Sequence, residues 1–262
     1  MSLIYATTNL LNSTTLPADD ATYRSSEDTV FQVEWLYNAR PSKPFRFTGN
    51  AGEWVKANLG ERKIMTISCL FNHNFSTAAV VALYASGSGH AGSWKLAGTY
   101  THREWDMFIK FGIFERWLRL DVTDVNTPIP QIGEWFVGEH SEFTNAYVNP
   151  VREDGPQYFV SDAVTEYGQD WEIYFGNSER LQMTLSSLSD PQTADDLHTF
   201  LDAVMQNGGR FVLIPKDTFP QCYYVKVMNR EDFATRRVFG DAMELRDWKL
   251  DLKVLVRGVT LS

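Results

Sequence analysis

The stretch from residue 53 to residue 92 holds the side chains with the widest range of chemistry in this chain. It contains a cysteine, two histidines and an Asn-His-Asn cluster, that is, Cys69, Asn72, His73, Asn74 and His90. Imidazole and thiolate groups bind metals, and they also act as bases or nucleophiles. The stretch is therefore the first candidate for an active site, and the spacing of its residues decides whether it is one.

A glycine run in the same stretch fits the pattern of a dinucleotide-binding loop. Gly87, Gly89 and Gly92 match G-x-G-x-x-G. That loop must open into a helix, because the free amides and the dipole of the helix N-terminus hold the pyrophosphate. Here Gly92 leads into "SWKLAGTY", which has a strand-like pattern. A flexible hairpin or loop is predicted, and no cofactor.

Metal and catalytic patterns are missing from the sequence. The five histidines show neither H-x-x-H nor H-E-x-x-H spacing, and no G-x-S-x-G elbow occurs. Cys69 and Cys222 both lie in apolar runs typical of buried free thiols. We therefore predict no metal site and no enzyme. Two alternatives stay open, namely Ca²⁺ held by distant loops and a pair of carboxylates, assembled in space, that cleaves glycans.

The elements that position these residues are mainly strands in the first part of the chain. Strands are expected at residues 64–71, 79–85, 117–122 and 132–137, and in the third of these every second residue is apolar. Trp54 and Leu59 are expected to point into a core. Asn72, His73 and Asn74 follow a strand, so a structural corner is expected there, with a ligand contact as the alternative.

The second part of the chain is of mixed type. Residues 149–156 gather turn-forming residues and charges, and this composition predicts a linker. Two paired strands, joined through "GNSE", are expected at 171–175 and 180–185. A helix is expected at about 193–207, capped by Thr193 and ended by Asn207-Gly208-Gly209. Further strands follow, and the last, "WKLDLKVLV", is expected to have one dry face and one wet face.

Charge and hydropathy exclude two classes of partner. The 262 residues carry a formal net charge of −9, and no run of lysine and arginine could follow a phosphate backbone. We therefore expect no sequence-specific binding of nucleic acid. No stretch approaches the roughly 20 apolar residues that cross a bilayer, so membrane insertion is not expected.

The order of elements in the first part resembles a known family. The run "RPSKPFRFTGNAGEWVKANLGERKIMTISCLFNHNFSTAAVVALYAS", followed by "RWLRLDVTD" and "IGEWFVGE", is similar to the discoidin or galactose-binding-like β-sandwich, a jelly roll, in the form found in virion proteins of tailed bacteriophages. The resemblance covers residues 1–148. It implies a β-sandwich domain without a catalytic signature.

Residues 157–262 resemble a second phage family. Strands, one helix, "GGRFVLIPKD" and a long last strand are similar to the small β-sandwich or barrel of siphophage tail tubes and distal tail proteins. This resemblance implies self-association into a ring, hexameric in many members, contacts with other tail proteins, and a location in the virion tail. The sandwich domains of such proteins often decorate the outside of the tail, and some of these domains recognise saccharides of the host surface.

Three functions from different classes follow. The favoured one is a structural virion protein of a phage tail, at the tail tip, baseplate hub or tube-associated ring, with a role in assembly and in host attachment. The alternative is a carbohydrate-binding adhesion module, and a glycan-processing enzyme is the third. The ligand loops expected for the first domain contain Asn72, His73, Asn74, His90 and Trp94.

Overall fold

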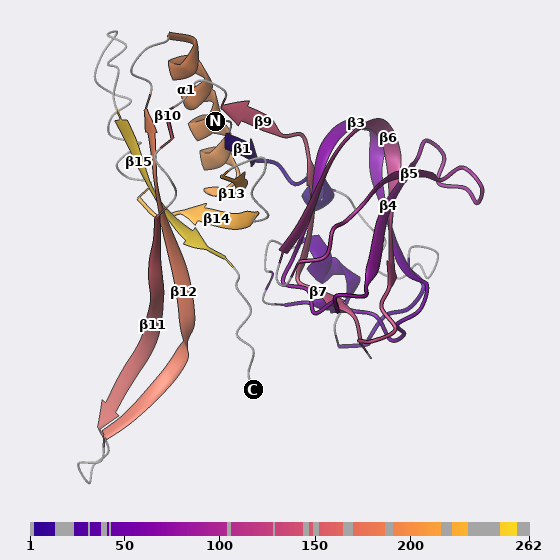
Figure 1. Ribbon diagram of the computed structural model, residues 1–262, viewed down its shortest axis with the longest axis horizontal. Helices are drawn as coiled ribbons and strands as arrows, with labels where there is room; N and C mark the ends of the chain where they lie inside the picture. Colours follow the sequence, from indigo (N-terminus) through magenta and orange to yellow (C-terminus); the bar gives the residue numbers. More distant parts are fainter. Residues whose placement is uncertain are drawn as a thin grey trace. The chain divides into compact units, whose positions relative to one another are not determined.

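The protein is described by a computed structural model (Figure 1). The structure describes residues 3–13, 24–30, 32–37, 41, 43–103, 106–127, 129–143, 147–148, 152–164, 170–186, 191–215, 222–229 and 247–255. It is mainly β, as predicted, with one α-helix among these residues. The chain divides into two compact units. The sandwich unit comprises residues 3–142 and 211–223, and the helix unit comprises residues 143–210 and 224–262, together with residues 1–2.

The sandwich unit is built around a five-stranded antiparallel sheet in the order β5-β4-β6-β3-β8. Its strands are β3 (Glu53–Phe71), β4 (Val80–Ser86), β5 (Lys95–Thr99), β6 (Asp106–Thr123) and β8 (Glu134–Gly138). β2 (Phe45–Arg46) and β7 (Gln131–Ile132) form a separate two-stranded sheet. β1 (Leu3–Ala6) pairs with β13 (Arg210–Ile214), and both belong to an eight-stranded sheet whose strand path is β10-β12-β15-β14-β13-β1-β9. Two 3-10 helices, η1 (Leu10–Ser13) and η3 (Val33–Tyr37), also contribute buried side chains.

Alternation along the strands decides which side chains enter the core. Leu118, Leu120 and Val122 of β6 are fully buried, which confirms the face predicted from sequence. In β3, Val55, Ala57 and Leu59 are buried in the same way. The placement of Trp54 in the core was wrong. It alternates with these buried residues, so its side chain lies on the outer face and is half-buried.

Strand β3 is longer than the predicted 64–71 and contains two irregularities. Its register with β6 shifts between Asn58 and Lys63 and again between Met65 and Ile67. A shift of one residue exchanges the two faces of a strand. Consequently the core-facing positions are odd-numbered up to Met65, whereas Ser68 and Leu70 contribute to the core beyond it.

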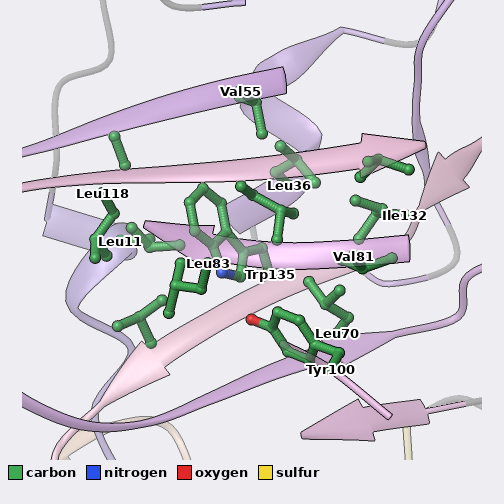
Figure 2. Packing of buried hydrophobic residues seen from close by; sticks show 14 of the residues in the cluster. Leu11, Leu36, Val55, Leu70, Val81, Leu83, Tyr100, Leu118, Ile132 and Trp135 are labelled. Atoms are coloured by element: carbon green, nitrogen blue, oxygen red, sulfur yellow. The ribbon is translucent and has the colours of Figure 1, made fainter. Parts of the chain in front are cut away.

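The indole of Trp135 lies in the middle of this core (Figure 2). Its Nε1–H donates to Ser68 Oγ at 3.1 Å, and Ser68 Oγ lies 2.5 Å from the hydroxyl of Tyr100. Burial raises the pKa of that phenol, which therefore stays protonated. Ser68 Oγ also donates to Phe136 O at 3.2 Å, so each of the three buried donors has an acceptor.

The helix unit has an open sheet in which β10, β12, β15 and β14 are hydrogen-bonded in that order and β11 pairs with β12. The bounds are β10 (Tyr147–Val148), β11 (Arg152–Val164), β12 (Asp170–Ser186), β14 (Tyr223–Val227) and β15 (Asp247–Val254). Leu250, Leu252 and Val254 of β15 are buried while Asp251 is exposed, which confirms its dry and wet faces. Because the strand path is open, this sheet is not a barrel.

Strand β12 corrects the prediction of two strands joined through "GNSE". Residues 170–186 form one continuous strand, and the segment 176–179 lies within it. Gly176, Asn177 and Ser178 pair with β11, whose register shifts on either side of the residues they face. Such bulges accommodate turn-forming residues inside a ribbon without ending it. Strand β11 also begins at Arg152, inside the segment expected to be a linker, while the domain boundary itself stays a prediction.

The single helix, α1 (Pro191–Gln206), begins two residues before the predicted start. Thr193 is therefore inside the helix and does not cap it. Proline suits the first helical position because its missing N–H has no partner there. The predicted end is confirmed, since Gly209 N–H donates to Val204 O at 2.8 Å and both Gly208 and Gly209 have positive φ. The described residues contain no helix of the length and hydropathy that a membrane span requires.

Candidate ligand-binding face

The corner predicted at residues 72–74 is held together by its own side chains. Asn72 adopts a left-handed φ of 54°, and its Nδ2 donates to Pro41 O at 2.7 Å. Asn74 Nδ2 donates to Ile129 O at 2.9 Å, and its Oδ1 accepts from the Gln131 amide at 2.8 Å. Both amide side chains are thus used to turn the chain, and a ligand role for them stays a prediction.

His73 is the buried member of this corner. Its ring stacks on Phe75 with 4.8 Å between centroids, and its Nδ1 accepts the Phe75 amide at 3.3 Å. Burial, helped by the neighbouring ring of His102, lowers the pKa of His73 to about 4, while Asp124 acts in the opposite direction. His73 is therefore neutral at pH 7, and its Nε2 has no hydrogen-bond partner among the residues that the structure describes.

The glycine-rich run forms a tight turn between β4 and β5. Ser86 Oγ accepts from the amides of Ser88 and Gly89, and Ser93 Oγ donates to His90 O at 2.7 Å. His90 itself is exposed. Gly89 has a φ of +75°, and a Cβ there would lie 2.7 Å from the Trp117 ring. The run leads into strand β5, as expected from sequence, and it sets the position of the next residue of interest, Trp94.

Trp94 belongs to a cluster of aromatic and charged side chains on the outer face of the five-stranded sheet. Register brings the members together: Lys56 on β3 is opposite Arg119 on β6, which in turn is opposite Tyr84 on β4. Trp54 is opposite Asp121 in the adjoining row. We call this surface the aromatic–cation face, and it comprises Trp54, Lys56, Tyr84, Trp94, Arg119 and Asp121. All six side chains are half-buried.

The two cations of the face are held against the rings. Lys56 Nζ lies 4.4 Å from the centroid of Trp54 and 5.8 Å from that of Trp94. Arg119 Cζ lies 5.0 Å from the centroid of Tyr84 and 5.3 Å from that of Trp94. These distances fit cation–π contacts. Trp94 thereby contacts both cations and ties β5, β6 and β3 together on this side of the sheet.

Asp121 fixes the guanidinium of Arg119. Arg119 Nε and Nη2 donate to Asp121 Oδ1 and Oδ2, each at 2.7 Å, in a bidentate pair. The side chains keep 25% and 30% of their surface exposed, so the pair remains open to a ligand. A guanidinium has five N–H groups, of which this pair uses two. The rest of the fork can donate to a bound molecule.

Sequence reasoning named Trp94 but missed the other five members of the face. The alternation of buried and outward residues along β3 and β6 could have identified most of them. Val55 and Ala57 enter the core, as do Leu118 and Leu120, so the residues between them must share the opposite face. That these outward residues are neighbours follows from the pairing of β3, β4 and β6. This pairing cannot be predicted from the sequence of any one strand.

Other chemistry considered from sequence finds no support here. Among the described residues, no group of three or more histidine, cysteine or acidic side chains could hold a metal ion. Cys69 and Cys222 are buried free thiols, as predicted. Burial and the neighbouring Cys69 raise the pKa of Cys222, which keeps that thiol protonated and unreactive. The acidic pairs at 195–196 and 231–232 lie outside the residues whose side chains are described.

Comparison with known proteins gives structural likeness only. Neither a protein-family model nor a curated protein sequence matches the chain. Chitosan-binding module 1 from a chitosanase/glucanase of Paenibacillus sp. IK-5 is 18% identical, with a TM-score of 0.43, over 50% of this chain and 99% of that module. CBM32-1 from a family 31 glycoside hydrolase of Clostridium perfringens is 10% identical, with a TM-score of 0.38, over 44% and 89%.

A third similar structure contains a sugar. The CBM32 of AlyQ in complex with 4,5-unsaturated mannuronic acid is 13% identical to this chain, with a TM-score of 0.37, over 44% of this chain and 90% of that one. These structural neighbours are carbohydrate-binding modules, and none of the three is a phage tail protein. Since identities and TM-scores are this low, an inference about function must come from the side chains of the aromatic–cation face.

Proposed function

We propose that the sandwich unit is a carbohydrate-binding module and that a saccharide binds on the aromatic–cation face. The observation that carries the proposal is the half-buried ring of Trp94, which lies near two cations that also contact the rings of Trp54 and Tyr84. A sugar ring has an apolar C–H face and a rim of hydroxyl groups. Aromatic side chains offer a rigid apolar surface for the first, and Arg119, Lys56 and Asp121 offer donors and acceptors for the second.

A glycan array tests this proposal. Wild-type protein should bind a defined set of saccharides, and Trp94→Ala should weaken that binding by about tenfold, because the central stacking ring is lost. Phe114→Ala is the matched control. Phe114 is an aromatic residue of β6 that is 57% exposed and lies outside the face. The absence of any hit for the wild type, or equal binding by wild type and Trp94→Ala, would remove the proposal.

A second candidate function is that of a structural subunit which assembles with copies of itself, as in a phage tail. One observation favours it. Residues 157–164 of β11 and 170–178 of β12 pair with one another, and within the described part of the chain β12 pairs with β15 over residues 180–186 alone (Figure 1). The far part of the hairpin is therefore a two-stranded ribbon, and such ribbons are marginally stable until another strand or a partner covers them.

Light scattering on a sizing column tests the second candidate. The wild type should form a defined oligomer, and replacing residues 157–178 by an Asn-Gly turn should give a monomer, because the ribbon that supplies the free edges is removed. A wild-type protein that is monomeric at all concentrations would count against assembly. An oligomer that survives the replacement would place its contacts elsewhere.

A further inference from the structure

The charges of the aromatic–cation face do not balance. Lys56 and Arg119 are cations, whereas Asp121 is its one carboxylate, so the face carries a net positive charge in a chain whose net charge is −9. Both oxygens of Asp121 already accept from Arg119. Among the residues that the structure describes, no carboxylate lies within 4.0 Å of the Lys56 ammonium. The close contacts of this ammonium among those residues are with the rings of Trp54 and Trp94.

The environment of Lys56 is unfavourable to its charge. Burial lowers the pKa of Lys56, the neighbouring guanidinium of Arg119 lowers it further, and Asp121 offsets only part of this effect. A cation in such a place gains from a negative group that enters beside it, because the new charge opposes the repulsion from Arg119. A neutral ligand would leave the repulsion as it is.

The donors that remain are of the kind that binds a carboxylate. After its pair with Asp121, Arg119 keeps its other Nη group and one further N–H, and Lys56 occupies the opposite position on the neighbouring strand. Both cations touch the ring of Trp94. A sugar ring stacked on Trp94 would thus bring a carboxylate substituent within reach of a guanidinium fork and an ammonium group.

We propose that the ligand of this face is an anionic saccharide, namely one with a uronic acid unit, whose carboxylate is received by Lys56 and Arg119. The inference rests on the proposed function and deepens it by naming the class of sugar. We expect Lys56 to discriminate by charge, because no carboxylate among the described residues forms an ion pair with its ammonium. The aromatic rings stack on the sugar, and we expect their contribution to affinity to be the same for acidic and neutral sugars.

Titration calorimetry at low ionic strength separates these contributions. The probes are a tetramer of galacturonic acid, its carboxyl-reduced counterpart, which is a galactose tetramer, and a sulfated galactose tetramer. Wild-type protein should bind the uronic acid tetramer at least tenfold more tightly than the reduced one. The variant Lys56→Gln should lose most of that preference, because its affinity falls further for the uronic acid tetramer than for the reduced one, and Lys56→Arg should restore it.

Lys95→Gln is the matched control for charge. Lys95 is exposed and pairs with Ala85, whose side chain is in the core, so Lys95 lies on the other side of its strand from the face. This variant should keep the full preference. Thermal unfolding of each variant verifies that it is folded.

The outcomes distinguish the two proposals. Equal affinity for the acidic and reduced tetramers, or a preference that persists in Lys56→Gln, overturns the inference and leaves the carbohydrate-binding function in place. A sulfated tetramer that binds more tightly than the uronic acid also overturns it, since the receptor would then favour sulfate over carboxylate. If none of the tetramers binds and no saccharide on the array does, the proposed function fails together with the inference.

Discussion

Arg119 is fixed before any ligand arrives. The carboxylate of Asp121 holds two of its N–H groups, while the rings of Tyr84 and Trp94 lie 5.0 and 5.3 Å from its Cζ. A side chain held in this way loses little further conformational entropy on binding. An exposed, flexible lysine would instead lose conformational entropy when a ligand orders it, and this loss would weaken binding. The face is preorganised at its centre.

The replacement Arg119→Lys tests this role while the charge stays the same. A lysine ammonium cannot make the bidentate pair with Asp121 or lie flat between two rings, so saccharide affinity should fall by about tenfold. Calorimetry with the strongest array ligand measures the change. Arg116→Lys, the same exchange on the same strand but outside the face, should leave affinity unaltered. An Arg119→Lys variant that binds like the wild type would show that the fork is not used.

His73 makes stability depend on pH in a defined window. Its pKa is about 4 in the folded protein against 6.5 for an unperturbed histidine, so the unfolded chain takes up a proton first as pH falls. Stability is therefore complete above pH 6.5 and decreases toward pH 4, by about 3 kcal/mol for this group. Below pH 4 both states are protonated and the loss is constant.

Denaturant unfolding at several pH values measures this effect. Between pH 6.5 and pH 4 the wild type should lose about 3 kcal/mol of unfolding free energy relative to His73→Phe. Phenylalanine keeps the stack on Phe75 but cannot titrate, so this group makes no pH-dependent contribution in the variant. A difference that stays constant over this range would contradict the buried, neutral state of His73.

At the scale of elements, the turn between β4 and β5 positions Trp94 by contact with β6. Gly89→Ala should destabilise the protein by about 2 kcal/mol, since a Cβ there combines a positive φ with a 2.7 Å approach to the Trp117 ring. Gly92→Ala is the matched variant, with a φ of +84° and open space around it, and should cost about 1 kcal/mol. Equal losses in denaturant unfolding would show that the Trp117 contact is unimportant.

Local patterns predicted the elements better than they predicted the site. Apolar alternation located Leu118, Leu120 and Val122, and terminal glycines located the end of α1. The same approach split β12 in two, because residues that usually turn the chain are accommodated by bulges in the paired strand. It also misplaced Trp54. The hydrophobic character of tryptophan suggested the core, whereas Trp54 alternates with the buried residues Val55 and Ala57 and therefore lies on the outer face.

The aromatic–cation face could not be assembled from sequence for a different reason. Its members come from β3, β4, β6 and the residue before β5, and β6 lies between β3 and β4 in the sheet. Lys56 and Arg119 are 63 positions apart, and only the register of the pairing places them opposite each other. Each segment shows one or two outward polar residues, which are typical of any solvated strand.

At the scale of the whole molecule, the two units suggest separate tasks. The sandwich unit presents a positive aromatic surface on an acidic protein, which suits recognition of a ligand. The helix unit carries a hairpin whose far part has paired strands on one side only, which suits assembly. The two proposed functions are compatible, because several copies of the proposed saccharide site in one assembly would raise avidity for a glycan-covered surface.

The most direct test of the central claim is an NMR titration of ¹⁵N-labelled protein with the strongest saccharide from the array. The account predicts saturable shifts of the indole N–H resonances of Trp54 and Trp94, while the indole of Trp135, buried in the core, stays unchanged. Shifts centred on the corner at residues 72–74, with the indoles of Trp54 and Trp94 unmoved, would contradict it.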